Sequence, residues 1–455
     1  MRFRLHGFLH DLPPGPTSFP HFSYEMGKRL YDNPLGTLMN YYDEYGPVFT
    51  LRFLGQEMVF LIGPEANQKI LVSDYRDFSW EKGLLAELIP FIGYGLLTTD
   101  DAEHDRARKL LAPAFYPARI KSYGERMTAR AVAAAQELEV GDLFELHAWT
   151  REVALKIAGD VLLGMDTPKE KAEYFAEHFE KGLGYYDGYF WQTLFMRGPG
   201  SQQARMKKHV EKLEQVIKEE IDERRSWPEG GEAILDLLCH AEADGERFSP
   251  REIRDHLFTL LFAGHDTTAA TVAWLFTLIC RHPDAYERLQ DEIDEVLGGR
   301  EPTPEDLFGG MPYLDMVVKE TLRLYPPAWF GPRLARKEFT VCGHRIPANT
   351  HVTYSSWMTH RLPEIYPDPE AFKPERFSEE NYRALQPGAY VPFGRGPRTC
   401  IGMRFGELEA KIIAVVLMQH YKLELFPGQQ FGARTVPTIS PRHGVKIRLR
   451  QRASQ

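Results

Sequence analysis

The sequence predicts a mainly α-helical protein with small β-sheets, organised as one large helix-rich domain over residues 1–455. Three observations lead to this fold class. Apolar residues recur at helical spacing along most of the chain, strict apolar–polar alternation is confined to short segments, and no long linker or low-complexity stretch divides the sequence. The chain is longer than most single domains, but its breaks are short Gly- and Pro-containing segments that are typical of loops between helices.

The predicted elements begin after an N-terminal extension, residues 1–20. Residues 48–62 alternate apolar and polar on either side of Gly55, which predicts a β-hairpin. Helices are predicted over residues 103–112, 118–137, 147–164, 168–185, 202–225, 232–243, 250–281, 283–297, 313–325 and 402–417. Further strands are expected around residues 339–342, 350–355, 421–426 and 444–449. The long apolar segment 250–281, which Pro283 helps to end, is the predicted central helix.

Composition and charge exclude several classes of protein. A net charge of −9 gives no sign of nucleic-acid binding, which usually needs a basic excess. The four cysteines are far apart and form no CxxC pair, so a disulfide framework or a cysteine-rich zinc site is not expected. No window approaches the roughly 20 apolar residues of a membrane span. Only a short mixed segment precedes the proline-rich turn at Leu12, so we expect a soluble, cytoplasmic protein without a transmembrane anchor.

One segment, residues 393–402, carries the strongest chemical signal. It contains Phe393, three glycines, a proline and Arg398, and its cysteine, Cys400, lies near the start of a predicted helix. Glycine and proline let a main chain turn tightly and approach a flat partner closely, and a helix N-terminus favours a thiolate over a thiol. A thiolate shielded by Phe393 and close to an arginine suits the axial ligand of a haem iron. A buried cysteine without a ligand role is the alternative for the residue type alone.

The predicted central helix carries a second unusual segment, residues 263–268, with the sequence Ala-Gly-His-Asp-Thr-Thr. Glycine in a helix interior costs about 1 kcal/mol relative to alanine, and threonine hydroxyls can bond to the preceding turn and bend the axis. A local opening there would leave room for a diatomic ligand and a water, and an alcohol beside a carboxylate can relay protons. A buried helix with a satisfied polar notch is the alternative.

Both segments resemble motifs of the cytochrome P450 family. The cysteine segment agrees with F-x-x-G-x-R-x-C-x-G at every fixed position, and the helix segment agrees with (A/G)-G-x-(D/E)-T. Residues 320–323 match E-x-x-R, and residues 373–377 resemble the P-E-R-F segment, so the motifs occur in the family's order along nearly the whole chain. The resemblance implies the cytochrome P450 fold, in which a large single helix-rich domain encloses haem b (iron protoporphyrin IX).

The resemblance also implies roles for individual residues. Asp266 would relay protons from bulk solvent, and Thr267 would hold water beside the bound oxygen, whereas His265 occupies a variable position with no catalytic role. Glu320, Arg323 and Arg376 would form a buried structural network. Without the resemblance, the i, i+3 spacing of the first two is typical of a surface pair.

Haem propionates need cations, and the fork of an arginine matches a carboxylate. The resemblance implies that these partners are His104, Arg108, Arg333 and Arg398. His104 stands where many relatives carry tryptophan, and Arg336 is close enough in sequence to replace Arg333. A solvated charge is the alternative for each arginine. The other groups that the resemblance places at the haem are Cys400 as iron ligand, Phe393, Gly394 and Ala263.

The substrate would bind over the haem, between segments that vary within the family. Two of these segments are rich in aromatic residues: the first contains Phe78, Trp80 and Phe91, and the second contains Tyr185, Tyr186, Tyr189, Phe190, Trp191 and Phe195. An aromatic lid suggests a hydrophobic small-molecule substrate, such as a fatty acid, terpenoid or steroid-like compound. Packing between helices in the core explains the same aromatic residues equally well.

The resemblance implies a monooxygenase that inserts one oxygen atom of O2 into such a substrate. The segment after Cys400 is too short for a flavin reductase, so we expect a separate ferredoxin or flavodoxin as electron donor. Arg106, Lys109, Arg395 and Arg404 could form a basic patch for it, or could be scattered solvated cations. A peroxide-driven hydroxylase of the same fold is less expected, because such relatives generally lack the acid–alcohol pair. A haem-based sensor is a further alternative, although no output domain is visible.

Overall fold

The computed structural model describes residues 12–16, 27–30, 32–53, 56–141, 143–164, 169–186, 201–227 and 231–452. The chain forms two compact units whose segments interleave along the sequence. Unit 1 comprises Met1–Glu87, Ala328–Ala371 and Glu380–Cys400, and unit 2 comprises Leu88–Pro327, Phe372–Glu379 and Ile401–Gln455. That the whole chain is one domain stays a prediction.

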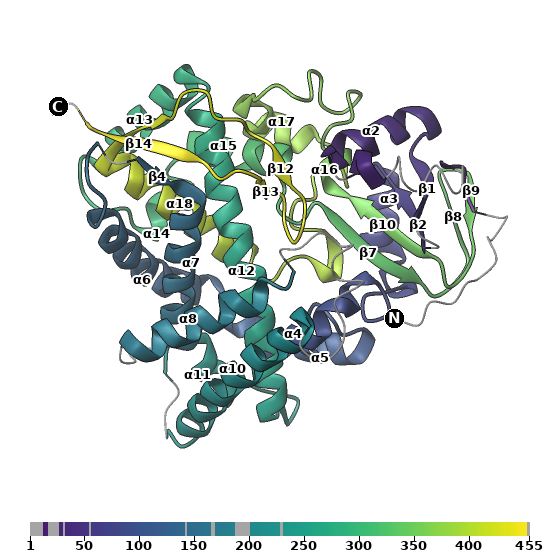
Figure 1. Ribbon diagram of the computed structural model, residues 1–455, viewed down its shortest axis with the longest axis horizontal. Coiled ribbons are helices and arrows are strands. Elements are labelled where there is room, and N and C mark those ends of the chain that lie inside the picture. Colours follow the sequence, from purple (N-terminus) through teal and green to yellow (C-terminus); the bar gives the residue numbers. More distant parts are fainter. Residues whose placement is uncertain are drawn as a thin grey trace. The chain divides into compact units, whose positions relative to one another are not determined.

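Unit 1 is built on a five-stranded sheet with the strand order β1-β2-β10-β7-β3 (Figure 1). The strands are β1 (Val48–Phe53), β2 (Gln56–Leu61), β10 (His351–Ser355), β7 (Phe330–Ala335) and β3 (Phe78–Ser79). β1 and β2 form the predicted hairpin, β10 runs parallel to β2, and β7 is antiparallel to both β10 and β3. A small hairpin, β8 (Phe339–Val341) with β9 (His344–Ile346), extends from this unit. Its short helices are α2 (Pro34–Tyr45), α3 (Pro64–Gln68) and α16 (Ser356–Thr359).

The core of unit 1 lies on this sheet, because alternate strand residues point to one face. Val48, Val59, Leu61 and Val352 are among its fully buried residues. The proline-rich turn is attached to the edge strand, since Thr50 donates its backbone N–H to the carbonyl oxygen of Pro14 at 2.9 Å. The rest of the predicted N-terminal extension lies outside the described residues.

Unit 2 is helical. Its helices are α4 (Ile89–Ile92), α5 (Asp101–Leu111), α6 (Pro117–Gln136), α7 (Leu146–Leu163), α8 (Lys169–Leu183), α10 (Gln202–Arg225), α11 (Ile234–His240), α12 (Pro250–Ile279), α13 (Pro283–Leu297), α14 (Pro304–Leu307), α15 (Pro312–Leu324) and α18 (Met403–His420). A three-stranded sheet orders β11 (Tyr421–Leu425), β14 (Lys446–Gln451) and β4 (Leu143–Glu145). The remaining strands form two short pairs, β5 (Glu242–Ala243) with β6 (Glu246–Arg247), and β12 (Ala433–Arg434) with β13 (Ser440–Pro441). Helix α17 (Glu379–Ala384) begins with the last residue of the segment 372–379, and its remaining residues belong to unit 1.

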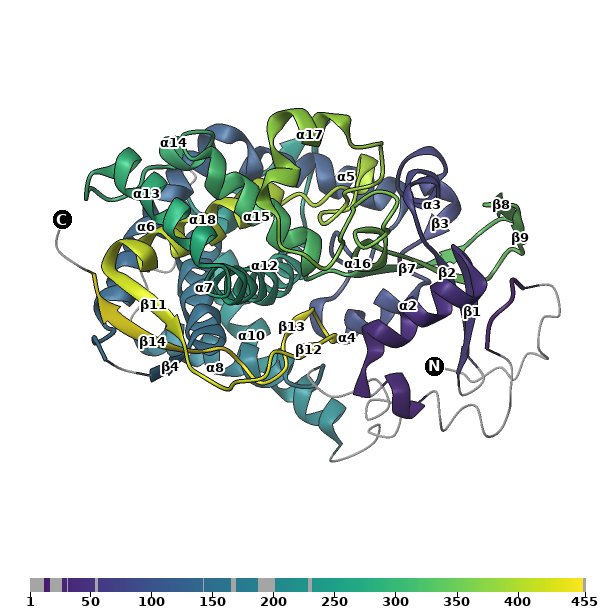
Figure 2. The same ribbon diagram turned by 90° about the horizontal axis from the view of Figure 1, so that it is seen from above.

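The long helix α12 runs through the middle of unit 2, with α7 and α18 beside it (Figure 2, which looks nearly down its axis). Its start is specified by a capping box, in which Ser249 and Glu252 satisfy each other's backbone N–H groups, and by Pro250 in the first turn. Most of its side chains are buried all round, as expected for a helix in the centre of a large unit.

The mainly helical fold with small sheets is as predicted, and the long predicted helices are present within a few residues. The prediction of a helix over 232–243 was wrong at its end. Helix α11 stops at His240, and Glu242–Ala243 pairs instead with Glu246–Arg247 around an Asp244-Gly245 turn in which both residues have positive φ. No described helix is long and apolar enough to cross a bilayer.

Candidate active site

The cysteine segment of unit 1 forms a tight loop that presents its thiol outward. The backbone N–H of Cys400 donates to the carbonyl oxygen of Phe393 at 2.9 Å, across a short 3-10 helix, Gly396–Arg398. Gly394 and Gly396 have φ of +68° and +71°, a region that favours glycine. A Cβ on Gly396 would lie 2.3 Å from the carbonyl oxygen of Leu71, so glycine is also required there by space. The side chain of Cys400 is exposed, and the four cysteines, all described, form no disulfide.

Two aromatic residues lie at this loop. Phe393 is half-buried, and the position of a Cβ on Gly394 lies 3.8 Å from the hydroxyl of Tyr354 on β10. A soft sulfur donor on an exposed position of a glycine-rich loop fits the iron of a haem. Helix α18 begins with Met403, so Cys400 precedes its first turn, as predicted.

Two of the predicted propionate partners lie together in unit 1. The guanidinium carbon of Arg333 is 3.2 Å from the centre of the Trp80 ring, and that of Arg398 is 4.5 Å from it. Arg333 is only 2% exposed, so it is not a solvated charge. Arg336, the alternative, is half-buried and donates to the carbonyl oxygen of Arg76 at 3.3 Å. The structure thus favours Arg333 over Arg336 as the buried cation.

The other two predicted partners lie on α5 in unit 2. His104 is buried and Arg108 is half-buried, and their spacing of four residues places them on one helix face. Nδ1 of His104 lies 3.1 Å from Oδ1 of Asp105. One face of α5 therefore offers a buried imidazole and a partly exposed guanidinium.

Helix α12 has an open stripe in its middle, formed by Leu260, Ala263, Gly264 and Thr267. These residues are partly exposed, as is Phe262, although the helix around them is buried. Their spacing of three and four residues makes them one face. The hydroxyl of Thr267 donates to the carbonyl oxygen of Ala263 at 2.6 Å, and the helix continues unbroken through Gly264. The predicted opening is therefore a bare face of the helix and not a break in its hydrogen bonds.

Asp266 points away from the open stripe and is buried among polar groups. Burial disfavours its carboxylate, but a hydrogen bond from the Thr438 hydroxyl and the charges of Arg151 and Arg434 outweigh this effect, so the pKa of Asp266 is lowered. Nε of Arg151 lies 3.7 Å from Oδ1 of Asp266. The aspartate and threonine of the predicted pair thus occupy neighbouring positions, one ionised inside the protein and one on the open face.

The predicted structural network is present, and its Glu320–Arg323 pair is fully buried. Arg323 donates two hydrogen bonds to Glu320, at 2.7 and 2.8 Å, and both side chains have no exposed surface. The backbone N–H of Lys373 donates to Glu320 at 2.9 Å, and Nε of Arg376 lies 3.6 Å from it. The network therefore ties the segment 372–379 to α15.

Sequence reasoning missed four residues that shape these sites. Thr438 and Arg151 contact Asp266 from distant segments, whereas the sequence assigned Thr438 and Trp80 only to the pocket wall. The fourth, Glu409 on α18, is buried and accepts a hydrogen bond from Thr268 at 3.1 Å. Burial raises the pKa of Glu409 to about 8. No local pattern marks these residues, because each acquires its role through a contact distant in sequence.

Of the aromatic residues predicted as lid or core, Phe91 is packed as core. It is fully buried, and its ring lies within 6.4 Å of the rings of Phe179, Tyr186, Phe258 and Phe262, centre to centre. Residues 187–200, which include the aromatic positions 189–191 and 195, lie outside the described residues, so whether that segment is lid or core stays a prediction.

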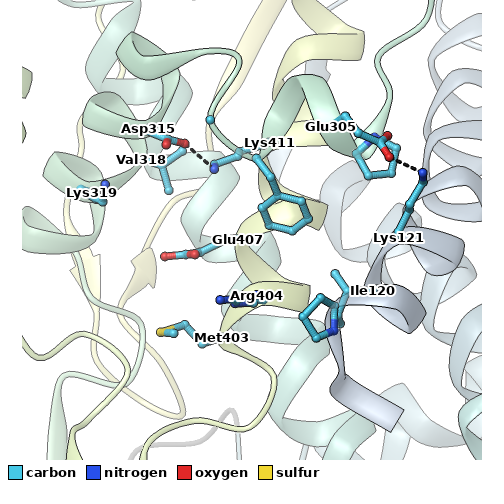
Figure 3. A pocket seen from close by; sticks show the side chains of 14 residues that line it. Ile120, Lys121, Glu305, Asp315, Val318, Lys319, Met403, Arg404, Glu407 and Lys411 are labelled. Carbon is cyan, nitrogen blue, oxygen red and sulfur yellow. Dashed lines mark hydrogen bonds and ion pairs between the residues drawn. The ribbon is translucent and has the colours of Figure 1, made fainter. Parts of the chain in front are cut away.

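A pocket of about 600 Å³ lies within unit 2, away from these groups (Figure 3). An ion pair between Lys121 and Glu305 stands at one end of it, and an ion pair between Lys411 and Asp315 stands at the other. Arg404 and Glu407 also line the pocket, and burial raises the pKa of Glu407. Neither Cys400 nor any residue of the open stripe lines this pocket. The pocket is therefore separate from the groups of the candidate active site.

The predicted basic patch is only partly available. Arg106 pairs with Glu246 and Glu252, and Lys109 pairs with Asp244. These two cations are therefore neutralised by acidic residues of their own unit. Arg395 and Arg404 are exposed.

Comparisons with known proteins agree with these motifs. The family model for cytochrome P450 matches residues 13–443. Cyclooctatin synthase from Streptomyces melanosporofaciens is 31% identical over 407 residues, or 86% of each chain. Cyclooctat-9-en-7-ol 5-monooxygenase from the same organism is 30% identical over 421 residues, covering 91% of this chain and 90% of the relative. The solved structure of retinoic acid-bound cyanobacterial CYP120A1 matches with a TM-score of 0.84 and 28% identity, over 97% of this chain and 100% of that chain. The chain therefore belongs to the cytochrome P450 family, whose members are haem-dependent oxidoreductases.

Proposed function

We propose that this protein is a haem-thiolate monooxygenase in which Cys400 is the axial ligand of haem b. The observation that carries the proposal is the geometry of the cysteine loop, which fixes its backbone through Phe393 and glycines of positive φ while leaving the sulfur exposed. Haem, when bound there, supplies the activation of O2 and the transfer of one oxygen atom to the substrate. Arg333, Arg398, His104 and Arg108 would hold its propionates, with Phe393, Gly394 and Ala263 in contact with it.

The protein's own part in the reaction is to deliver protons and exclude water. Asp266 is held as a carboxylate directly before Thr267 in sequence, so it can accept a proton and pass it on through the polar groups around it. Thr267 is the hydroxyl on that stripe, and with its proton donated to Ala263 its oxygen can accept a hydrogen bond from a water. The pair would thus move protons from the polar interior to the face where oxygen reacts.

The substrate that we propose is a terpenoid. The open stripe and Phe262 offer only apolar contacts besides Thr267, so a ligand lying there gains little from charge. One relative is named for oxidising cyclooctat-9-en-7-ol, and a structural neighbour binds retinoic acid, a terpenoid polyene. We also propose that a separate ferredoxin or flavodoxin supplies the electrons. A cytoplasmic location stays a prediction.

The absorption spectrum of the reduced protein with carbon monoxide tests the iron ligand. We expect the strongly red-shifted Soret band of a thiolate complex in the parent, and its loss in Cys400→Ser. Cys342→Ser is the matched control, since Cys342 is a partly exposed cysteine in the β8–β9 turn of the same unit. A thiolate spectrum that survives in Cys400→Ser would overturn the assignment.

Turnover experiments test the electron source and the substrate class. Terpenoids, fatty acids and steroids are first compared for the spectral shift that follows displacement of iron-bound water. The compound that binds is then incubated with NAD(P)H and a surrogate ferredoxin system, or with hydrogen peroxide alone. Product only with the electron-transfer system supports the proposal, whereas equal product with peroxide alone favours a peroxide-driven hydroxylase.

A further inference from the structure

Trp80 contacts two separate arginines of unit 1, and its place in the backbone explains how. Strand β3 pairs with β7 so that Phe78 lies opposite Ala335 and Ser79 opposite Leu334. Continuing this antiparallel register places Trp80 next to Arg333. The indole therefore meets Arg333 because of strand pairing and not through a chance surface contact.

A tight turn after β3 fixes the indole at that position. The backbone N–H of Gly83 donates to the carbonyl oxygen of Trp80 at 3.0 Å, and that of Lys82 donates to the Ser79 hydroxyl at 3.0 Å. The turn lies directly on β7, since a Cβ on Gly83 would be 3.2 Å from the Cα of Arg333. A side chain at residue 83 would require the turn or the strand to shift by a few tenths of an ångström.

The second arginine comes from the cysteine loop. Arg398 ends the 3-10 helix Gly396–Arg398, two residues before Cys400, and the loop is seated on the backbone of Leu71 at Gly396. Its guanidinium carbon lies 4.5 Å from the centre of the Trp80 ring, and that of Arg333 lies 3.2 Å from it. One half-buried indole thus joins the sheet to the cysteine loop through two cations.

The energetics of this cluster point to a ligand with two negative charges. Tryptophan is the strongest aromatic partner for a cation, and guanidinium groups stack on its face while their N–H edges stay available. Arg333 is buried and also donates to the carbonyl oxygen of Pro332 at 2.8 Å. A dicarboxylate suits two guanidinium groups that share one aromatic partner, since the fork of an arginine matches a carboxylate, and haem carries two carboxylates.

We propose that Trp80 is a positioning residue for the haem propionates: it presets Arg333 and Arg398 as a pair beside the cysteine loop. The inference rests on the proposed function, because it takes haem as the dianionic ligand. It assigns Trp80 a role other than the substrate-pocket wall predicted from the sequence.

Haem release tests this role without using enzyme activity. The transfer of haem from the holoprotein to excess apomyoglobin is timed for the parent, Trp80→Phe and Trp80→Leu. We expect Trp80→Leu to release haem roughly tenfold faster, since leucine removes the whole cation–π contribution, and Trp80→Phe to fall between it and the parent. Trp80→Phe also keeps the test decisive if the leucine variant fails to fold. Equal release from all three proteins would overturn the proposal.

Two controls distinguish loss of the contacts between Trp80 and the two arginines from a general loss of stability. Trp357 is a buried tryptophan of the same unit that stacks on Arg361 at 4.0 Å, and neither residue is a candidate haem partner. Trp357→Leu should lower thermal stability but leave haem release near the parent rate well below the unfolding temperature. The double variant Trp80→Leu with Arg398→Gln should release haem more slowly than the product of the two single-variant effects predicts, because the indole acts partly through Arg398. Full additivity, or fast release from Trp357→Leu, would contradict the proposal.

Failure of this inference can be told apart from failure of the proposed function. A thiolate–CO spectrum in the parent with unchanged release from Trp80→Leu overturns the positioning role alone. If Trp80→Leu changes only the spectral response to substrates, Trp80 is a pocket wall and the inference is wrong. If the parent lacks a thiolate spectrum but Trp80→Leu still loses haem faster, the proposed function is wrong, whereas the role of Trp80 in positioning the two arginines is supported.

Discussion

At the scale of single residues, the chain holds two buried carboxyl groups beside α12 in opposite protonation states. Asp266 is surrounded by Arg151, Arg434 and the Thr438 hydroxyl, which together lower its pKa despite burial. Glu409 has only the Thr268 hydroxyl to offset its burial, which raises its pKa to about 8. Both acids are fully enclosed, so the difference between them comes from the nearby cations and not from exposure.

Glu409→Gln should therefore become more stable relative to the parent as the pH rises. The folded protein keeps the Glu409 proton up to about pH 8, whereas an exposed glutamate loses it near the usual value of 4.5. Folding then requires proton uptake, so the stability of the parent falls between these two pH values. The neutral glutamine removes this loss, and we expect its advantage in apparent unfolding temperature to grow by a few °C from pH 5 to pH 8.

Thermal unfolding of both proteins at several pH values measures this effect. Glu380→Gln, at an exposed position on α17, is the control and should follow the parent at every pH. A constant difference between Glu409→Gln and the parent across the range would show that Glu409 is already ionised in the folded protein.

At the scale of elements, the sequence predicts long helices well and strands with interruptions poorly. Helix α13 shows regular apolar spacing between Pro283 and Gly298, so its limits could be predicted to the residue. Strand β7 was missed as an element because it contains Gly331 and Pro332, which are typical of a turn. Its conformation depends on neighbours: the ring of Tyr354 occupies the space where a side chain on Gly331 would lie.

The residues of the candidate site also differ in how well the sequence predicts them. The cysteine loop and the aspartate–threonine pair are continuous in sequence, so their residues could be named in advance. The burial of a residue could not be predicted from the sequence. Glu320 and Arg323 have the spacing of an ordinary surface pair, and only the packed structure shows that neither is exposed. Contacts such as Thr438 with Asp266 join positions 172 residues apart, and no local pattern specifies them.

Breaking the Glu320–Arg323 pair should destabilise the protein strongly. Glu320→Gln leaves a buried guanidinium without its carboxylate and also weakens the bond to Lys373, and such losses cost about 3–5 kcal/mol. Glu152→Gln is the matched control, because Glu152 pairs with Lys156 on α7 with both side chains well exposed. Exposed pairs contribute at most about 1 kcal/mol. Similar unfolding temperatures for the two variants would contradict a structural role for the buried network.

Gly264→Ala on α12 should separate helix stability from ligand access. A Cβ there meets no atom within 4 Å, so alanine fits and should stabilise the helix by up to about 1 kcal/mol. The new methyl group projects from the open stripe, however, and should weaken the binding of carbon monoxide and of substrates. Gly159→Ala is the control, since Gly159 is also helical and equally unobstructed but lies on α7. It should gain stability without any change in ligand binding, and parallel behaviour of the two variants would exclude a ligand at the stripe.

At the scale of the whole molecule, neither unit is a continuous piece of chain. Unit 1 consists of three segments of the chain, and segments of unit 2 separate them in the sequence. The parts that carry the candidate haem contacts of unit 1 are correspondingly distant in sequence: the turn at Trp80, strand β7 with Arg333, and the cysteine loop with Arg398. Folding must therefore bring Arg333 and Arg398 to the Trp80 ring from separate segments, and haem binding is expected to add an anionic partner for both.

Removal of haem should therefore destabilise the protein as a whole. A ligand that binds only the folded state adds about 4 kcal/mol at a thousandfold excess over its Kd, and the haem propionates would add charge pairing with Arg333 and Arg398. Protein expressed under haem limitation should unfold roughly 10 °C below the holoprotein, and added haem should restore the difference. The gap should also shrink at high salt, which weakens the attraction between the propionates and the arginines. Identical unfolding temperatures with and without haem would contradict a stabilising contact between these arginines and a dianionic ligand.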